Sequence, residues 1–463
     1  MIQIEKWRLY KWFCLPFVQV VLLSIITLCS PGMFNAINGM GGAGQLEKDV
    51  EVVSKANAVL YALFAIVGLI AGGINNVLGP RATLFIGSTG YLLYVGALFA
   101  YNSTRSSAFM ISAGAYLGIC AALLWAAQGQ IMMSYPDERN KGRYIGVFWM
   151  IFNFGAVIGA LAVLAFNFKK ESSGAVTNVT YIGIMLVISL GVVLTLVLVP
   201  PHRVRRRDGS TILLAKHPYW RDELVAITKL MTNRRLLLLF PLFFTSNFFY
   251  SYQLHINGFY FSVRTRALNN TFYWFAQIVG ALAFGVFLDS GSLSRRRRAY
   301  FGLAFVGIAF SATWCAALFW QLTFSKGTKQ PEVDWESPHF AEKFFVYVLF
   351  GICDSVFQVY CYWLMGAMSN DSMELSRYAG FYKGIQSAGG AISWAIDASS
   401  ISFLGELLLN WALLLFSLPM AFLVCRSITD TNYTDDDTLL PSQIDEYALS
   451  PASWEDRKYL GKA

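Results

Sequence analysis

Apolar stretches of about 20 residues recur along this chain, and this pattern constrains its fold more than any other feature. A helix rises about 1.5 Å per residue, so such a stretch crosses the roughly 30 Å hydrocarbon core of a bilayer. Of the 463 residues, 56% are hydrophobic and only 14% are charged, which leaves too little charge for the surface of a soluble protein of this size. The sequence predicts an all-α membrane protein with twelve transmembrane helices, at 12–38, 55–77, 82–101, 108–133, 144–166, 180–200, 236–262, 271–289, 299–321, 343–367, 378–400 and 403–425.

The basic residues are distributed asymmetrically between alternate loops. If the N-terminus is cytoplasmic, 25 of the 36 Lys and Arg lie on the inner side and ten lie on the outer side, while Lys383 lies within a span. Inner loops of membrane proteins carry the excess of basic residues, so the sequence predicts that both termini are cytoplasmic. Topology therefore accounts for the net charge of +8, and we expect the chain to be surrounded by a lipid bilayer and not to bind nucleic acid.

Two polar segments divide the chain. We expect an N-terminal six-helix bundle over residues 1–200, a basic cytoplasmic linker over 201–235, a C-terminal six-helix bundle over 236–425 and a cytoplasmic tail over 426–463. Pro31-Gly32 is expected to kink or unwind the first helix, because Pro lacks the backbone donor that the helix requires.

The two halves share a faint internal repeat, as a six-plus-six duplication requires. The second and the eighth span each end with a Gly, three further residues and then an Asn or Asp. Basic residues follow in both cases. The fifth and eleventh spans both open on Arg-Tyr-x-Gly. Chance similarity between glycine-rich helices is the alternative. The residues concerned are Gly72, Asn76, Gly79 and Arg81, Gly285 and Asp289, and Arg143 and Arg377.

These residues resemble the major facilitator superfamily, whose signature between helices 2 and 3 is Gly-x-x-x-Asp-Arg/Lys-x-Gly-Arg/Lys-Arg/Lys. Gly72, Gly79 and Arg81 match this signature, Asn76 stands where the family has Asp, and Asp289 keeps the acid in the second copy. The resemblance implies two six-helix bundles related by a pseudo-twofold axis along the membrane normal. It also implies that the residues of the repeat form a conformational latch at the cytoplasmic helix ends.

Three motifs look more narrowly like the fungal type of the Unc-ninety-three-like branch, the ion channel regulatory proteins. They are Ser-Pro-Gly-Met-Phe-Asn-Ala-Ile-Asn-Gly-Met-Gly-Gly-Ala-Gly-Gln at 30–45, Trp-Ala-Ala-Gln-Gly-Gln at 125–130 and Asn-Lys-Gly-Arg-Tyr at 140–144. This branch includes transporters, channel-regulating subunits and a receptor-trafficking partner. The resemblance leaves two functions open. One is alternating-access transport of an unknown small solute, with proton coupling as one form of it, and the other is regulation or trafficking of another membrane protein such as an ion channel.

Ionisable groups inside the membrane are the first candidates for function, because a charge at the bilayer centre costs about 2.5–3.5 kcal/mol on insertion scales. Asp354 lies near the middle of the tenth predicted span, and Lys383 lies in the eleventh. We expect Asp354 to face a central cavity as a proton-coupling or substrate-binding carboxylate, with Lys383 balancing its charge. The alternative is structural, with Asp354 in a polar contact and the Lys383 ammonium reaching the inner membrane surface.

Amide side chains on the expected cavity-lining helices are the next candidates for contact with a substrate, although each is explained as readily by a hydrogen bond between helices. The sequence carries no catalytic signature such as Gly-x-Ser-x-Gly or His-Glu-x-x-His, so we expect neither an enzyme nor a metal or cofactor site. The amide candidates are Gln128, Gln130, Gln358, Asn35 and Asn153.

Short motifs in loops and in the tail concern modification and location. Asn102, Asn178 and Asn269 each begin an Asn-x-Thr or Asn-x-Ser acceptor in a predicted outer loop, so we expect glycosylation there. The tail carries an acidic residue four positions before Leu439-Leu440, a pattern that resembles a sorting signal for endosomes or vacuoles. The expected location is the plasma membrane or an endosomal or vacuolar membrane.

Overall fold

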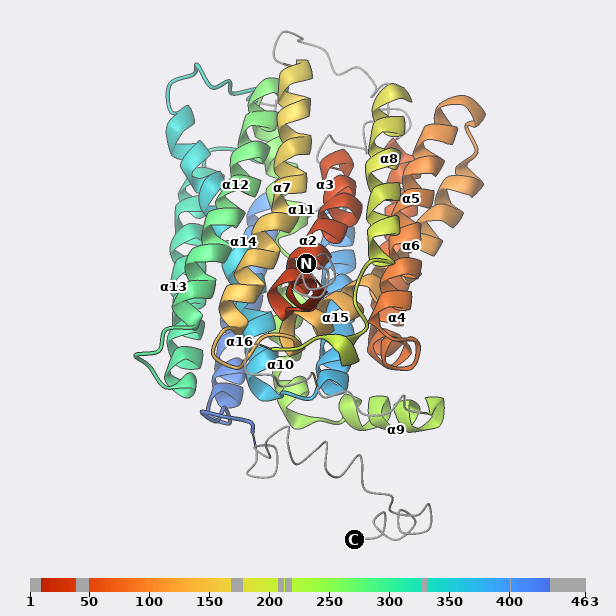
Figure 1. The fold of residues 1–463 in the computed structure, drawn as a ribbon. Helices are drawn as coiled ribbons and strands as arrows, with labels where there is room; N and C mark the ends of the chain where they lie inside the picture. The colour runs from red at the N-terminus through yellow and green to blue at the C-terminus, as the bar shows by residue number, and fades with distance from the viewer. Residues whose placement is uncertain are drawn as a thin grey trace, which may run out of the picture.

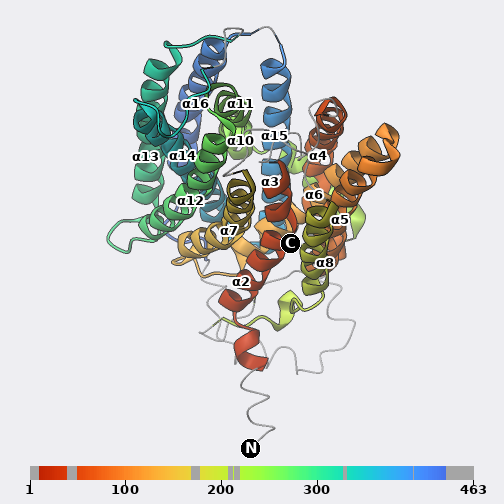
Figure 2. The ribbon, with the colours of Figure 1, turned by 90° about the horizontal axis from the view of Figure 1, so that it is seen from above.

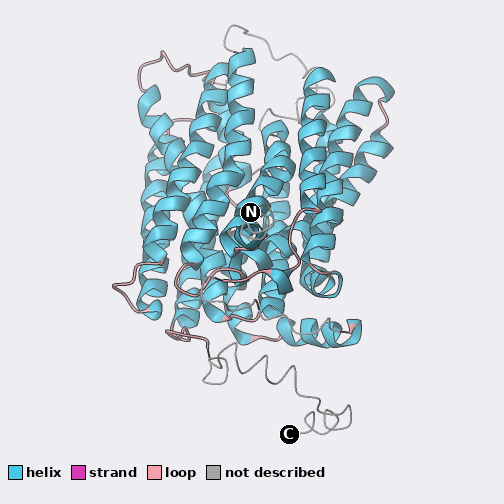
Figure 3. Cartoon of the chain, in the orientation of Figure 1, coloured by secondary structure: helices cyan, strands magenta, loops and turns pink. Residues whose placement is uncertain are grey.

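The computed structural model describes residues 10–38, 50–167, 178–206, 212, 219–326, 331–399 and 401–433. These residues are almost entirely helical (Figure 3), and within the described ranges one isolated β-bridge joins Phe261 and Val333. The helical fold class predicted from the sequence is therefore confirmed. The tail motif at 435–440 lies outside the described residues.

The helices follow the predicted spans closely. Ahead of the linker come α2 (Pro16–Thr27), a π-helical turn (Leu28–Gly32), α3 (Met33–Asn38), α4 (Val50–Leu78), α5 (Pro80–Thr104), α6 (Ser107–Ser134), α7 (Lys141–Asn167) and α8 (Asn178–Thr195). The linker contributes a short 3-10 turn (Pro201–Arg203) and α9 (Trp220–Met231). After it come α10 (Arg234–Thr245), α11 (Tyr250–Tyr260), α12 (Val263–Leu288), α13 (Arg295–Gln321), α14 (Phe340–Met368), α15 (Ser372–Asp397) and α16 (Phe403–Cys425).

By length and composition, ten of the described helical segments are long and apolar enough to cross a membrane. The other two predicted spans differ for physical reasons. The span predicted at 236–262 is broken into α10 and α11. α15 is too polar because it carries residues such as Arg377, Lys383 and Gln386, of which Lys383 and Gln386 are buried inside the protein.

The first span is distorted as predicted. Pro31 lies inside the π-helical turn Leu28–Gly32 between α2 and α3. Its ring cannot supply a backbone donor, and a widened turn accommodates the missing hydrogen bond without ending the helix.

The prediction of one continuous helix over 236–262 was wrong. The α-helical hydrogen bonding is interrupted between α10 and α11, where tighter turns such as the bond from Ser246 N–H to the Phe243 carbonyl replace it. The Ser246 carbonyl accepts a hydrogen bond from Gln358 Nε2 at 3.1 Å, and its hydroxyl accepts one from Gln386 Nε2 at 2.8 Å. Irregular backbone at membrane depth is tolerated where neighbouring helices satisfy it, as the side chains of α14 and α15 do here.

The segments before and after the linker meet through two equivalent helix pairs. α15 packs on α4 and α6, and α12 packs on α7. Because the internal repeat aligns α4 with α12 and α7 with α15, the α4–α15 and α12–α7 contacts are related by the pseudo-symmetry. Figure 2 shows α7 and α15 lying between the other helices that precede the linker and the other helices that follow it.

Glycines bring these helix pairs into backbone contact. A Cβ on Gly72 would lie 2.4 Å from Arg377 Cα, and a Cβ on Gly142 would lie 2.4 Å from the Gly285 carbonyl oxygen. Both contacts lie near the helix ends on the side where α9 runs across the bundle, at the bottom of Figure 1. We call this the α9 side. Small residues let helix backbones approach closely, so the two halves are joined tightly there.

A bulkier residue at Gly72 should open the α9 side. The Gly72→Val side chain would overlap the α15 backbone and force α4 and α15 apart. We expect a thiol introduced by Met373→Cys, at a position only 8% exposed in the wild type, to react several-fold faster with a water-soluble maleimide. The exposed native thiol is removed by Cys315→Ser.

Gly183→Val is the matched control, since a Cβ at this α8 glycine meets nothing within 4 Å. An unchanged rate in Gly72→Val would contradict the close packing of α4 on α15.

Candidate functional site

The Lys383 ammonium lies where helices from the two halves meet, inside a ring of aromatic side chains. Its nitrogen lies 4.4 Å from the ring centroid of Trp125, 5.7 Å from Trp149, 5.4 Å from Tyr362 and 5.1 Å from Tyr382. The indoles come from α6 and α7, and the phenols come from α14 and α15. We call these five residues the Lys383 cage. Aromatic faces attract a cation electrostatically, which offsets part of the cost of burying this ammonium.

Asp354 is the second buried charge. Its carboxylate accepts hydrogen bonds from the Tyr250 hydroxyl, from the Tyr273 hydroxyl at 3.1 Å and from the amides of Gln277 at 2.7 Å and Gln358 at 3.5 Å. The side chain is fully buried among α11, α12 and α14. In this structure the carboxylate is enclosed by these side chains, and its place beside a cavity stays a prediction. Its donors replace the water that a carboxylate loses on burial.

Amide groups connect Asp354 to Lys383. Gln358, one turn from Asp354 on α14, accepts at Oε1 from the Tyr382 hydroxyl at 2.7 Å and from Gln386 Nε2 at 3.0 Å. Gln386 Oε1 in turn accepts from Lys383 Nζ at 2.7 Å. The two charges thus share one network of hydrogen bonds instead of the direct balance that their sequence positions suggested.

The other predicted amides divide between this network and the α9 side. Asn153 on α7 donates to Gln277 at 3.2 Å and so ties the first half of the chain to the Asp354 cluster. Gln128 accepts from the Tyr362 hydroxyl at 3.0 Å beside the cage. Gln130 lies on the α9 side instead, where it donates to the Ser372 carbonyl at 3.1 Å. Asn35 is partly exposed on α3 and lies outside the network.

The predicted latch includes a residue that the sequence did not single out. Glu223 of α9 is 3% exposed and receives two hydrogen bonds from the Arg377 guanidinium, at 2.9 and 3.0 Å. Asn76 donates to the same carboxylate at 3.2 Å and to the Met373 carbonyl at 3.1 Å. The amide at Asn76 fits this site, whereas an Asp there would face Glu223 with like charge. The signal for Glu223 was its place on an amphipathic helix whose Ile227 is also buried.

The second copy of the latch is built differently. The Asp289 carboxylate accepts hydrogen bonds from the backbone N–H groups of Gly142 at 2.8 Å and Arg143 at 2.6 Å, which begin α7. A carboxylate suits the positive end of a helix. Arg143 contributes only its backbone here, since its side chain is exposed. Burial raises the pKa of Asp289 to about 6 despite these two donors.

Two predicted latch residues act within one half of the chain. Gly79 has φ of +82° at the start of α5, a conformation that favours glycine. Arg81 donates to the Leu196 carbonyl next to α8. The observed partner of Arg81 therefore belongs to the same half of the chain.

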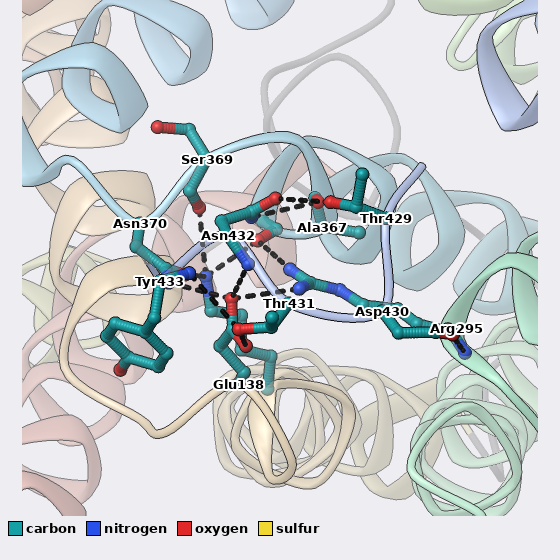
Figure 4. Close-up of polar contacts among 12 residues, drawn as sticks. Glu138, Arg295, Ala367, Ser369, Asn370, Thr429, Asp430, Thr431, Asn432 and Tyr433 are labelled. Carbon is teal, nitrogen blue, oxygen red and sulfur yellow. Dashed lines mark hydrogen bonds and ion pairs between the residues drawn. The ribbon is translucent and has the colours of Figure 1, made fainter. Parts of the chain in front are cut away.

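Glu138 makes a further cross-link on the α9 side (Figure 4). It lies between α6 and α7 and accepts from Arg295 of α13 at 2.9 Å, from Asn370 at 2.7 Å and from the Thr431 hydroxyl and the Asn432 N–H, each at 2.9 Å. Burial alone would raise the pKa of Glu138, but the Arg295 charge and these donors hold it below its ordinary value. The segment after α16 thus closes over the loop between α6 and α7.

The glycosylation acceptors separate into two groups. Asn102 and Asn178 lie at helix ends away from α9, and the Asn102 amide donates to Asn178 Oδ1 at 2.8 Å. Asn269 is fully buried in α12 and bonds to Asn257, so the folded protein has no room for a glycan there. The prediction of glycosylation at Asn269 was wrong because α12 begins earlier than the predicted span.

Comparison with known proteins places these features in a family. The sequence model described as "Ion channel regulatory protein UNC-93" matches residues 54–392. This chain belongs to the UNC-93 family. It is 41% identical over 437 residues to UNC93-like protein 1 of Arabidopsis thaliana, an alignment that covers 93% of this chain and 94% of the relative.

A second UNC-93 relative and a solved structure agree with this assignment. An UNC93-like protein of Schizosaccharomyces pombe is 40% identical over 410 residues, covering 87% of this chain and 81% of the relative. The fucose:proton symporter of E. coli superposes with a TM-score of 0.62 at 11% identity, covering 90% of this chain and 99% of that chain. The major facilitator fold of this UNC-93 family member is thereby confirmed. The cage, the Asp354 network and the latch residues all fall within residues 54–392.

The Glu223–Arg377 pair should hold α9 against the bundle. Glu223→Gln would leave the Arg377 charge without its partner, and breaking a buried pair costs several kcal/mol. We expect amide hydrogen exchange in α9 to accelerate roughly tenfold or more. Asp222→Asn, at the exposed neighbouring position, should leave exchange unchanged. Equal exchange in both variants would show that the pair does not anchor α9.

Asp289 should make stability depend on pH. Its pKa is higher in the folded protein, about 6, than its ordinary 3.8, so its protonated form favours folding and this contribution is lost as pH rises through about 6. Asp289→Asn removes this titration. We expect the free energy of unfolding of the wild type to fall relative to that of Asp289→Asn between pH 4 and pH 7, by about 3 kcal/mol. The melting temperatures of the two proteins, measured over this pH range, report this difference. Parallel pH profiles would contradict the assignment.

Proposed function

We propose that this UNC-93 family member is a secondary transporter that moves a small solute by alternating access. The observation that carries the proposal is the hydrogen-bonded network that holds Asp354 and Lys383 at the junction of the two halves. Ionisable residues inside a membrane are costly, and in transporters they mark solute and proton pathways. Asp354 is proposed as the coupling carboxylate, and Lys383 as a solute-binding or coupling cation.

The contacts on the α9 side support a molecule closed at one face. The glycine contacts, the Glu223–Arg377 pair, the Asp289 cap and the Glu138 cross-link all join the two halves there. The excess of basic residues on the same side supports a cytoplasmic α9, with both termini in the cytoplasm. Under this proposal the cytoplasmic face is the closed one and the solute enters from the opposite face, in the plasma membrane or an endosomal or vacuolar membrane. No catalytic step forms part of the proposal.

Asp354→Asn tests the proposal in proteoliposomes. Amino acids, sugars, amphiphilic metabolites and potassium are screened for flux with and without a pH gradient. We expect gradient-dependent flux in the wild type and its loss in Asp354→Asn, because an amide can neither exchange a proton nor compensate a buried positive charge. Asp222→Asn, exposed on α9, is the matched control and should retain flux. Flux in Asp354→Asn with its normal proton dependence would refute the coupling role.

The second candidate function is regulation or trafficking of another membrane protein, such as an ion channel. The match to a family described as ion channel regulatory proteins favours it. Absence of flux for every solute, together with a membrane protein recovered in complex with the chain from native membranes, would support this alternative over transport.

A further inference from the structure

The Lys383 cage has the composition of a site for an organic cation. Rings that face a cation within about 6 Å recognise ammonium groups, including quaternary ones. Four rings from four helices surround the Lys383 nitrogen, all within 5.7 Å. The ammonium donates to a neutral amide, Gln386 Oε1, at 2.7 Å. The cage therefore binds positive charge mainly through aromatic faces, and another cation could replace the lysine head group there.

Two polar atoms beside the cage lack partners within the described part of the chain. They are the Trp149 indole Nε1, a donor, and Asn153 Oδ1, an acceptor. Trp149 is 5% exposed and Asn153 is fully buried, and they lie one turn apart on α7. Buried polar groups are nearly always paired, so this donor and acceptor suit a ligand that carries a hydroxyl group.

The exposed surface of the cage lies on its indole side. Trp125 is 8% exposed, whereas Tyr362 and Tyr382 are fully buried. The phenols form the floor, where Tyr362 and Tyr382 are held by hydrogen bonds to Gln128 and Gln358. A solute would therefore approach past the indoles, next to the unpartnered atoms of Trp149 and Asn153.

We propose that the Lys383 cage binds a small hydroxylated ammonium solute, and that this solute enters in exchange for the proton of Lys383. The proposal rests on the proposed transport function and names its substrate class. The cost of burying charge is the reason that the solute and the proton must exchange. The network holds one carboxylate, Asp354, and one ammonium, and a second cation would leave uncompensated positive charge in a medium of low dielectric constant.

The exchange balances in charge and atoms. The Lys383 ammonium releases one proton to water on the open side, its neutral amine leaves the rings, and one monovalent cation takes its place. No covalent bond to carbon forms or breaks. The titratable groups facing Lys383 are Asp354, Cys361 and Tyr362 of α14 and Tyr382 of its own helix, while α6 and α7 present indoles. Asp354 is the carboxylate among them, so it supplies the compensating charge before and after the exchange.

Calorimetric titration of the protein in lipid nanodiscs tests the proposal without requiring transport. The probes are choline, its neutral isostere 3,3-dimethylbutan-1-ol and the anion 3,3-dimethylbutanoate, in two buffers of different ionisation enthalpy. We expect choline alone to bind the wild type, with release of about one proton. Equal binding of the three probes, preference for the anion, or choline binding without proton release would overturn the proposal.

Variants identify the site. We expect Lys383→Met to bind choline more tightly and without proton release, because the competing ammonium is gone. Trp125→Leu should weaken binding roughly tenfold, and Trp125→Phe, which keeps a ring and guards against misfolding, should weaken it less. Trp394→Leu, at a tryptophan 39% exposed on α15, is the control and should bind as the wild type does. Proton release that persists in Lys383→Met would overturn the exchange.

Flux assays separate this proposal from the proposed function. Choline binding with no flux of any solute would refute transport and leave the cation site standing. Flux of other solutes that is insensitive to Trp125→Leu, without choline binding, would refute the cation site and leave transport standing.

Discussion

A charge buried in a membrane protein must find its compensation inside the chain, and this constraint organises the centre of the structure. Lys383 is compensated by aromatic faces and one amide, and Asp354 by hydroxyl and amide donors. The donors to Asp354 come from α11, α12 and α14, while the break between α10 and α11 accepts hydrogen bonds from Gln358 and Gln386. The break in that span, the polarity of α15 and the cluster of aromatic residues around Lys383 are all consequences of placing these two charges in one network.

The same helices that carry the network also close the α9 side. α15 presents Lys383 at mid-depth and Arg377 near its beginning, and α7 presents Trp149 at mid-depth and Gly142 near its beginning. A change in the charge of the network would therefore act on helices that also hold the closed face. Pseudo-symmetry supplies the two glycine contacts, but the acids differ, since Glu223 of the linker serves one copy and Asp289 serves the other.

Periodic hydrophobicity was sufficient to predict the helices, because a spanning helix leaves a long apolar signal whatever its partners are. Gly72, Asn76, Gly285 and Asp289, which the internal repeat singled out, make contacts on one side of the structure, and their role as a latch stays a prediction. The sequence could not show that Gln358 and Gln386 compensate a broken helix, since this depends on which side chains meet across helices. Glu223 was missed because a basic linker hides a single acid, and the cage was missed because its four rings are up to 257 positions apart and look like ordinary core residues.

The most direct test of alternating access is the distance between the halves at both faces, measured by electron spin resonance in nanodiscs. One spin-label pair replaces Leu78 on α4 and Arg296 on α13, on the α9 side, and the other replaces Phe109 on α6 and Phe345 on α14, at the opposite face. Alternating access predicts two populations with reciprocal distances, so that the α9-side pair separates as the opposite pair approaches. A single unchanging distance at both faces, under every solute and pH condition, would contradict alternating access between the two halves.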